Sequence, residues 1–220
     1  MGVSNRNIDQ VIGILRREIK VFPDPSVTLV GKKWNDPFLV LISCILSLRT
    51  KDSTTLPASE RLFRLADTPQ KMLGLSSRKI EDIIYPVGFY RIKAKNIRGI
   101  CRDLIEKFGG RVPDELDVLL TLKGVGRKTA NLVLTEGFGK PGVCVDTHVH
   151  RISNRLGYVQ TAAPEETEEA LRKKLPKKYW REYNSLLVTW GQNICRPVSP
   201  FCSRCKIRKF CARRGVLLSR

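Results

Sequence analysis

Hydrophobic residues recur along this chain at the three- and four-residue spacing of helices, and no segment alternates as a strand would. Residues 8–20 carry an apolar stripe opposite basic residues, which predicts an amphipathic helix. Residues 37–48 are mostly apolar all round, so this helix is expected at the centre of the fold, begun by Asp36 as N-cap and by Pro37. The pattern predicts an all-α protein of roughly ten or more short helices.

Two polar or aromatic segments interrupt this pattern. Residues 49–52 form a basic tip after the apolar helix, where a side chain could reach a ligand or simply end the helix in solvent. Phe89 and Tyr90 precede closely spaced cations, a mixture that suits base stacking and phosphate contact. Packing of this aromatic pair into the core is the alternative.

Residues 122–126, Leu-Lys-Gly-Val-Gly, place two glycines directly before a helix-forming segment. Without a Cβ atom, Gly124 and Gly126 let backbone N–H groups approach an anion closely, at the positive end of the helix. The segment therefore indicates phosphate binding by Gly124, Val125 and Gly126. A tight turn between two helices explains the same residues, so the motif alone leaves both interpretations open.

Lys128 and Asp146 are the candidate reactive groups. Lys128 lies in the first helical turn beside Arg127, and both the helix end and this cation favour the neutral, nucleophilic amine. A solvated charge is the ordinary alternative. Asp146 directly precedes Thr147 and a new helix, so its default role is N-capping, which stabilises by roughly 1 kcal/mol. A capping acid can still face a reaction site.

The seven cysteines fall into two groups. Three lie in apolar surroundings and are expected to be buried thiols, namely Cys44, Cys101 and Cys144. The other four have the spacing C-x6-C-x2-C-x5-C and are Cys195, Cys202, Cys205 and Cys211. Four thiolates so spaced can bind one metal centre, and a single C-x2-C pair with wider arms favours an iron-sulfur cluster over zinc. A secreted disulfide framework does not fit, which indicates a reducing, intracellular compartment.

The charge of the chain points to a polyanionic partner. Lys and Arg number 40 against 21 Asp and Glu, a net charge of +19, which favours nucleic acid over an acidic membrane surface. No acidic residue follows Glu182, so Arg196, Arg204 and Lys206 belong to a basic surface around the cysteines. The longest apolar run is about half of the ~20 residues that span a bilayer, and no membrane association is expected.

Taken together, residues 122–131, the Val-Asp-Thr-His of residues 145–148 and the four late cysteines closely resemble the endonuclease III family of DNA glycosylases. The resemblance implies a helix-hairpin-helix DNA glycosylase fold of two helical domains. One is a six-helix barrel, expected at residues 30–140. The other joins residues 1–29 to residues 141–220 around a 4Fe-4S cluster bound by the four cysteines.

The resemblance also implies the chemistry. A member of this family is a bifunctional DNA glycosylase and AP lyase that removes oxidised or saturated pyrimidines in base excision repair. Lys128 would attack the anomeric carbon of the flipped nucleotide and form a Schiff base, and Asp146 would stabilise the positive charge that develops on the sugar. The strand would then be cut by β-elimination. The expected partner is double-stranded DNA with a damaged base or abasic site, bound by a monomer.

The resemblance further implies which residues contact DNA. Arg49 and Phe89 correspond to two wedge positions that fill the space left by the flipped nucleotide. The family has glutamine at the first of these, so the arginine leaves the preference for the opposite base open. The other expected contacts are Gly124, Val125, Gly126, Arg127, Thr129, His148, Arg196, Arg204 and Lys206.

Two other functions would use parts of the same sequence. A monofunctional mismatch glycosylase of the same superfamily is disfavoured, because the adenine-removing branch lacks a lysine at the position of Lys128. A non-catalytic DNA-binding module would use only the glycine turn and the basic cysteine segment.

Overall fold

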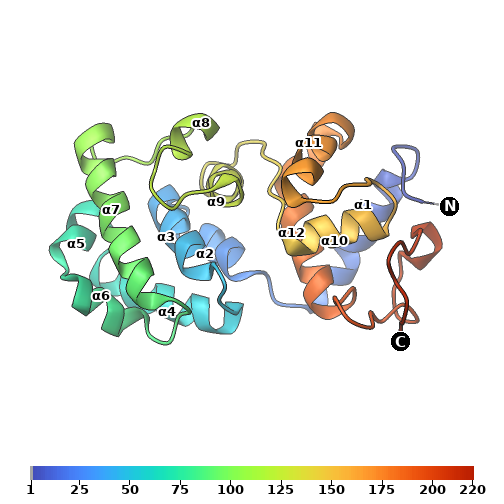
Figure 1. Cartoon of the computed structure of the whole chain (residues 1–220), viewed down its shortest axis with the longest axis horizontal. Coiled ribbons are helices and arrows are strands. Elements are labelled where there is room, and N and C mark those ends of the chain that lie inside the picture. The colour runs from blue at the N-terminus through green and yellow to red at the C-terminus, as the bar shows by residue number, and fades with distance from the viewer. Residues whose placement is uncertain (1) are drawn as a thin grey trace. The chain divides into compact units, whose positions relative to one another are not determined.

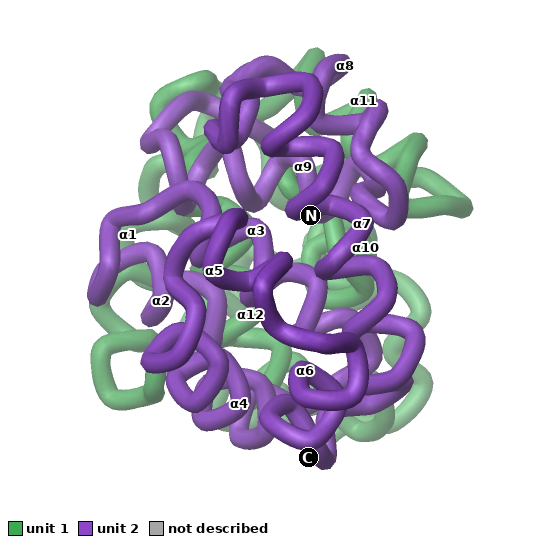
Figure 2. The backbone as a smooth tube through the Cα atoms, turned by 90° about the vertical axis from the view of Figure 1, so that its left-hand side faces the viewer, with its two compact units in different colours: residues 1–24, 143–220 green, residues 25–142 purple. Residues whose placement is uncertain are grey.

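The computed structural model describes residues 2–220, and these residues form helices and loops without any strand. The predicted all-α class is therefore confirmed. Contacts between Cα atoms divide the chain into unit 1, Met1–Asp24 with Val143–Arg220, and unit 2, Pro25–Gly142 (Figure 2). The expected domains, residues 30–140 and residues 1–29 with 141–220, remain a prediction.

Unit 2 is built from eight helices and one π-helical turn (Figure 1). They are α2 (Ser26–Trp34), α3 (Pro37–Ser47), α4 (Asp52–Leu65), α5 (Pro69–Gly74), α6 (Ser77–Ile84), α7 (Tyr90–Phe108), α8 (Leu116–Leu119), α9 (Arg127–Leu132) and the π-helical turn Val133–Gly137.

The predicted central helix is confirmed as α3. All residues from 38 to 46 are buried, and α2, α4, α7 and α9 pack against it. Asp36 caps its amino end, where Oδ1 accepts hydrogen bonds from the N–H groups of Phe38 at 2.7 Å and Leu39 at 3.3 Å. Because α3 is fixed in the core, the polar residues 48–51 that follow it leave the core at a defined position.

Two helices of unit 2 are not delimited by the hydrophobic pattern of the sequence. Helix α2 begins directly after Pro25, which is its N-cap, and lies between the helices predicted at residues 8–20 and 37–48. A proline near a helix start loses no internal hydrogen bond. Helix α4 begins at Asp52, the last residue of the basic tip, and contains Pro57.

Unit 1 combines the amino-terminal helix with the carboxy-terminal part of the chain. Its helices are α1 (Ile8–Glu18), the 3₁₀ helix Ile19–Val21, α10 (Thr147–Arg155), α11 (Pro164–Lys174), the 3₁₀ helix Lys177–Tyr179, α12 (Trp180–Asn193) and the 3₁₀ helix Arg208–Phe210. The apolar stripe of α1 packs into a core whose largest fully buried side chains are Tyr158, Tyr183 and Trp190. The amphipathic helix predicted at residues 8–20 is confirmed.

Within residues 2–220, none of the helices is both long enough and apolar enough to cross a bilayer.

Candidate functional site

The glycine turn before α9 has the backbone conformation that its sequence requires. Gly124 has φ of +84°, a conformation that side chains with a Cβ rarely adopt, and Asn96 Nδ2 lies 3.2 Å from where that Cβ would stand. In the described chain, the N–H groups of Gly124 and Gly126 donate no backbone hydrogen bond. The Val125 N–H instead donates to Leu122 O at 3.0 Å, so only the two glycine amides fit the expected contact with a phosphate.

The first three residues of helix α9 differ in how far they are exposed to solvent. Gly126 is its N-cap, with ψ of 177°, and Arg127 is exposed while Lys128 is half-buried. Thr129 is only 3% exposed. The Thr129 side chain lies in the core of unit 2, and the expected DNA contact of this residue stays a prediction.

The Lys128 side chain lies near the central helix of unit 2. Burial raises the pKa of the Cys44 thiol in α3 to about 12, and the positive charge of Lys128 opposes this rise. The role of Lys128 as a nucleophile stays a prediction.

Asp146 caps α10, as its sequence position predicts. Its Oδ1 accepts hydrogen bonds from the N–H groups of His148 at 2.9 Å and Val149 at 2.8 Å. The second carboxylate oxygen, Oδ2, takes no part in this cap. Capping and a role toward a ligand are therefore compatible, because they use different oxygens of one carboxylate.

His148 is connected through Arg151 to the segment that contains the four late cysteines. Arg151 Nη2 lies 3.1 Å from His148 Nδ1 and donates to Cys195 O at 2.8 Å. Burial lowers the pKa of Arg151, and the charges of Cys195 and Asp146 oppose that change. The residue expected to contact DNA thus has a structural partner, while its ring remains partly exposed.

The two expected wedge residues lie together in unit 2. The Arg49 guanidinium carbon is 5.6 Å from the centroid of the Phe89 ring, a cation–π arrangement. Phe89 is 55% exposed, so the alternative that it packs into the core is wrong. Both residues adopt positive φ, +51° for Arg49 and +58° for Phe89, which is uncommon outside glycine.

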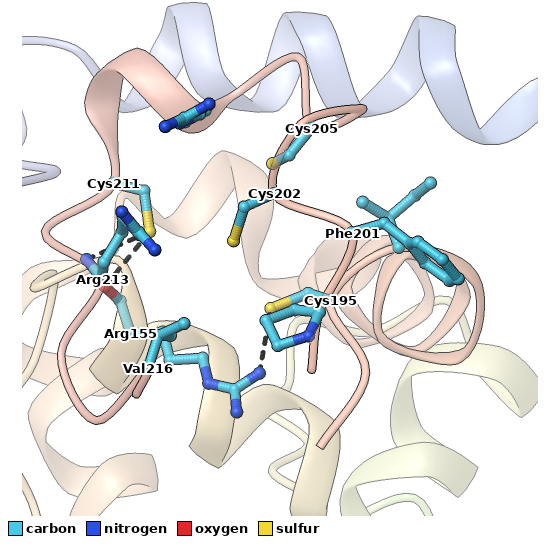
Figure 3. A pocket seen from close by; sticks show the side chains of 11 residues that line it. Arg155, Cys195, Phe201, Cys202, Cys205, Cys211, Arg213 and Val216 are labelled. Atoms are coloured by element: carbon cyan, nitrogen blue, oxygen red, sulfur yellow. Dashed lines mark hydrogen bonds between the residues drawn. The ribbon is translucent and has the colours of Figure 1, made fainter. Parts of the chain in front are cut away.

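The four late cysteines line one pocket of unit 1 (Figure 3). Cys195 follows α12, Cys202 and Cys205 lie in the next loop, and Cys211 follows the last 3₁₀ helix. The pocket has about 350 Å³ of empty space, part of it open to solvent. Within residues 2–220, no three His, Cys, Asp or Glu side chains are placed to hold a single metal ion. The four cysteines are thus gathered in one pocket without being arranged as ligands of a single ion.

Two thiols of this pocket are harder to ionise than an exposed cysteine. Burial raises the pKa of Cys205 to about 11 and also raises that of Cys211, and the neighbouring cysteines add to both effects. Thiolates are the form that binds metals, so a cationic group has to compensate their charge. The donor set suits iron or another thiophilic metal.

Arg155 is a site residue that the sequence prediction missed. It is 8% exposed, and its guanidinium donates to Arg196 O and Pro197 O, each at 2.6 Å, and to Cys195 Sγ at 3.5 Å. Its own carbonyl accepts from Cys211 Sγ at 3.3 Å. Arg155 therefore holds both ends of the cysteine segment. Its place three residues after the inward-facing Ile152 of α10 was the available signal.

The basic residues of the cysteine segment are arranged around Phe201. The guanidinium carbons of Arg196, Arg204 and Arg220 lie 5.1, 5.5 and 4.5 Å from the centroid of its ring. Arg196, Arg204 and Lys206 are all exposed. The surface can bind phosphates, because its cations have no acidic neighbours in the sequence.

The chain is similar to known proteins over most of its length. Residues 42–177 match the model of the HhH-GPD superfamily base excision DNA repair proteins. Endonuclease III of Thermotoga maritima is 50% identical over 205 residues, which cover 92% of this chain and 93% of that protein. The chain belongs to the endonuclease III family. Endonuclease III of Haemophilus influenzae is 38% identical over 200 residues, covering 91% and 93% of the two chains.

Solved structures of endonuclease III share the fold. A non-covalent endonuclease III–DNA complex matches with a TM-score of 0.81 and 36% identity, over 93% of this chain and 95% of that one. A trapped endonuclease III–DNA covalent intermediate matches with a TM-score of 0.79 and 35% identity over the same shares. The resemblance stated from the sequence is confirmed, and with it the helix-hairpin-helix glycosylase fold.

Proposed function

We propose that this endonuclease III family member is a bifunctional DNA glycosylase and AP lyase that removes oxidised or saturated pyrimidines from double-stranded DNA. The observation that carries the proposal is Lys128, half-buried in the first turn of α9 directly behind the glycine turn. An amine so placed lies next to backbone amides suited to a phosphate of the same nucleotide chain. The trapped covalent intermediate of a related endonuclease III supports covalent chemistry.

In the reaction we propose, Lys128 acts as a neutral amine. Its Nζ forms a bond to C1′ of the damaged nucleotide while the bond from C1′ to the base breaks, and the base leaves with the electron pair and takes up a proton. Opening of the sugar ring gives a protonated Schiff base. Loss of a C2′ proton then breaks the C3′–O bond, and the electron pair leaves with the 3′ phosphate. Water finally hydrolyses the Schiff base and restores the lysine.

Asp146 has the complementary role in this proposal. Positive charge develops on the sugar as the base departs, and a carboxylate stabilises such charge. The two carboxylate oxygens have different partners, which supports this role. Oδ1 accepts the two cap hydrogen bonds and Oδ2 does not. The cap would fix the carboxylate so that the second oxygen does not have to be oriented during the reaction.

Arg49 and Phe89 are the proposed wedge. Extrusion of a nucleotide costs a few kcal/mol, least for damaged bases that stack and pair poorly. The exposed Phe89 ring and the Arg49 guanidinium beside it would occupy the vacated space. Arg127, His148, Arg196, Arg204 and Lys206 are proposed to bind the DNA backbone around the lesion, with the chain acting as a monomer.

The four cysteines that line the pocket of unit 1 are proposed to hold a 4Fe-4S cluster. When bound, such a cluster cross-links four positions of the loop and compensates the charge of four thiolates. Arg155 would keep Cys195 and Cys211 oriented, and Phe201 would keep the surrounding arginines in place. Within residues 2–220 no cysteine forms a disulfide, which supports a reducing, intracellular compartment.

Duplex DNA with one thymine glycol tests this function. Release of the base together with strand cleavage is the expected result. Base release without cleavage would instead indicate a monofunctional glycosylase, and binding without either reaction a non-catalytic module. An undamaged duplex of the same sequence is the control and should remain intact.

A further inference from the structure

A lysine outside the proposed reaction centre is buried beneath the two wedge residues. Lys93 lies in the first turn of α7 and is 5% exposed. Its Nζ donates to Leu46 O at 2.8 Å, to Leu48 O, and to Thr50 Oγ1 at 3.0 Å. An ammonium group has three protons to donate, so all of them have acceptors here.

These acceptors lie where α3 ends. Leu46 belongs to the last turn of α3 and Leu48 is its C-cap, so the ammonium group neutralises carbonyls at the negative end of the central helix. Burial lowers the pKa of Lys93 to about 8, which leaves it mostly protonated at neutral pH. The charge thus fixes the point at which the chain leaves the core and continues to Arg49.

Thr50 connects this lysine to the second wedge residue. Its Oγ1 accepts hydrogen bonds from Lys93 and from the Gly88 N–H, the latter at 3.2 Å, and donates to Leu48 O at 3.3 Å. The two segments also touch directly, because a Cβ atom at Gly88 would stand 2.8 Å from Arg49 O. Gly88 precedes Phe89, so both wedge residues are anchored to one set of hydrogen bonds.

We propose that Lys93 is a positioning residue that holds Arg49 and Phe89 in the geometry needed to enter the DNA duplex. The inference rests on the proposed function. Both wedge residues have unfavourable positive φ values and exposed side chains, so their backbone needs a constraint besides the cation–π contact that they make with each other. A buried, fully paired ammonium beneath them supplies that constraint, and insertion into DNA benefits from groups that are already ordered.

Replacing Lys93 by methionine tests the role, since methionine keeps most of the side-chain volume and removes the three donors. The experiment compares single-turnover excision on two duplexes. In one the lesion is opposite a normal base, and in the other it is opposite an abasic spacer, which leaves little stacking or pairing for a wedge to overcome. We expect Lys93→Met to lower the rate about tenfold or more on the first and less than about threefold on the second.

The control is Lys107→Met, which removes an exposed lysine from the last turn of the same helix. It should leave both rates unchanged. If Lys93→Met does not fold, Thr50→Val removes one acceptor of the ammonium and the partner of Gly88. This variant should lower the rate on the paired duplex about threefold and leave the rate on the spacer duplex unchanged.

Equal losses on the two duplexes would show that Lys93 only supports folding, and no loss on either would show that the wedge does not need it. Each of these results overturns the inference while leaving the proposed function intact. A wild-type protein that excises from neither duplex overturns the proposed function and this inference together.

Discussion

Arg155 offers the most direct perturbation of the cysteine segment. Its side chain donates two charge-assisted hydrogen bonds to Arg196 O and Pro197 O at 2.6 Å from a buried position. Hydrogen bonds to charged groups contribute roughly 1.5–3 kcal/mol each, and the two carbonyls would lose their partner. In Arg155→Met, which keeps the aliphatic part of the side chain, we expect the free energy of unfolding to fall by about 3–5 kcal/mol.

The assay is urea unfolding followed by circular dichroism, together with absorbance of the purified protein near about 400 nm as the measure of bound iron-sulfur cluster. The variant should also lose most of this absorbance, because Cys195 and Cys211 contact the same arginine. Arg17→Met, an exposed arginine of α1 in the same unit, is the control. A loss of stability below about 1 kcal/mol with unchanged absorbance would refute the assigned role of Arg155.

Three other predictions follow from individual contacts. Asp146→Asn keeps a cap acceptor but removes the charge, so it should retain stability and lose at least about tenfold in excision rate, whereas Asp146→Ala should also lose about 1 kcal/mol of stability; equal excision by Asp146→Asn and wild type would limit the residue to capping. Arg204→Ala should reduce the slope of log binding constant against log salt by about 1, measured with undamaged duplex, and an unchanged slope would remove this residue from the DNA contacts. The lowered pKa of Lys93, about 8 against 10.5 in the unfolded chain, means that the unfolded chain binds more protons between these values. The unfolding free energy of wild type relative to Lys93→Met should therefore rise from pH 8 to pH 10.5, and a flat or falling difference would contradict this pKa.

Local patterns were sufficient to predict several parts of this structure. The apolar run of α3, the cap at Asp146 and the glycine turn each depend on residues within a few positions of one another. The grouping of the four late cysteines follows from their spacing in the same way. Such features are determined by short-range backbone geometry, which a sequence expresses directly.

Contacts between distant segments were not predictable in this way. Arg49 and Phe89 are forty residues apart, and their pairing depends on how α3 and α7 pack. The cations that follow Tyr90 are predicted to suit phosphate contact, but one of them, Lys93, shares the buried face of α7 with Ile97 and Ile100. Lys93 and Arg155 are both charged residues within the apolar stripe of a helix. Helical periodicity could have revealed both of them as buried residues.

Covalent trapping tests the central claim, that Lys128 is the nucleophile. Reduction by borohydride during the reaction with thymine glycol DNA converts a Schiff base into a stable protein–DNA adduct. We expect this adduct with wild type and with Lys140→Gln, an exposed lysine of unit 2, and no adduct with Lys128→Gln. An adduct that persists in Lys128→Gln at the wild-type yield would contradict the account.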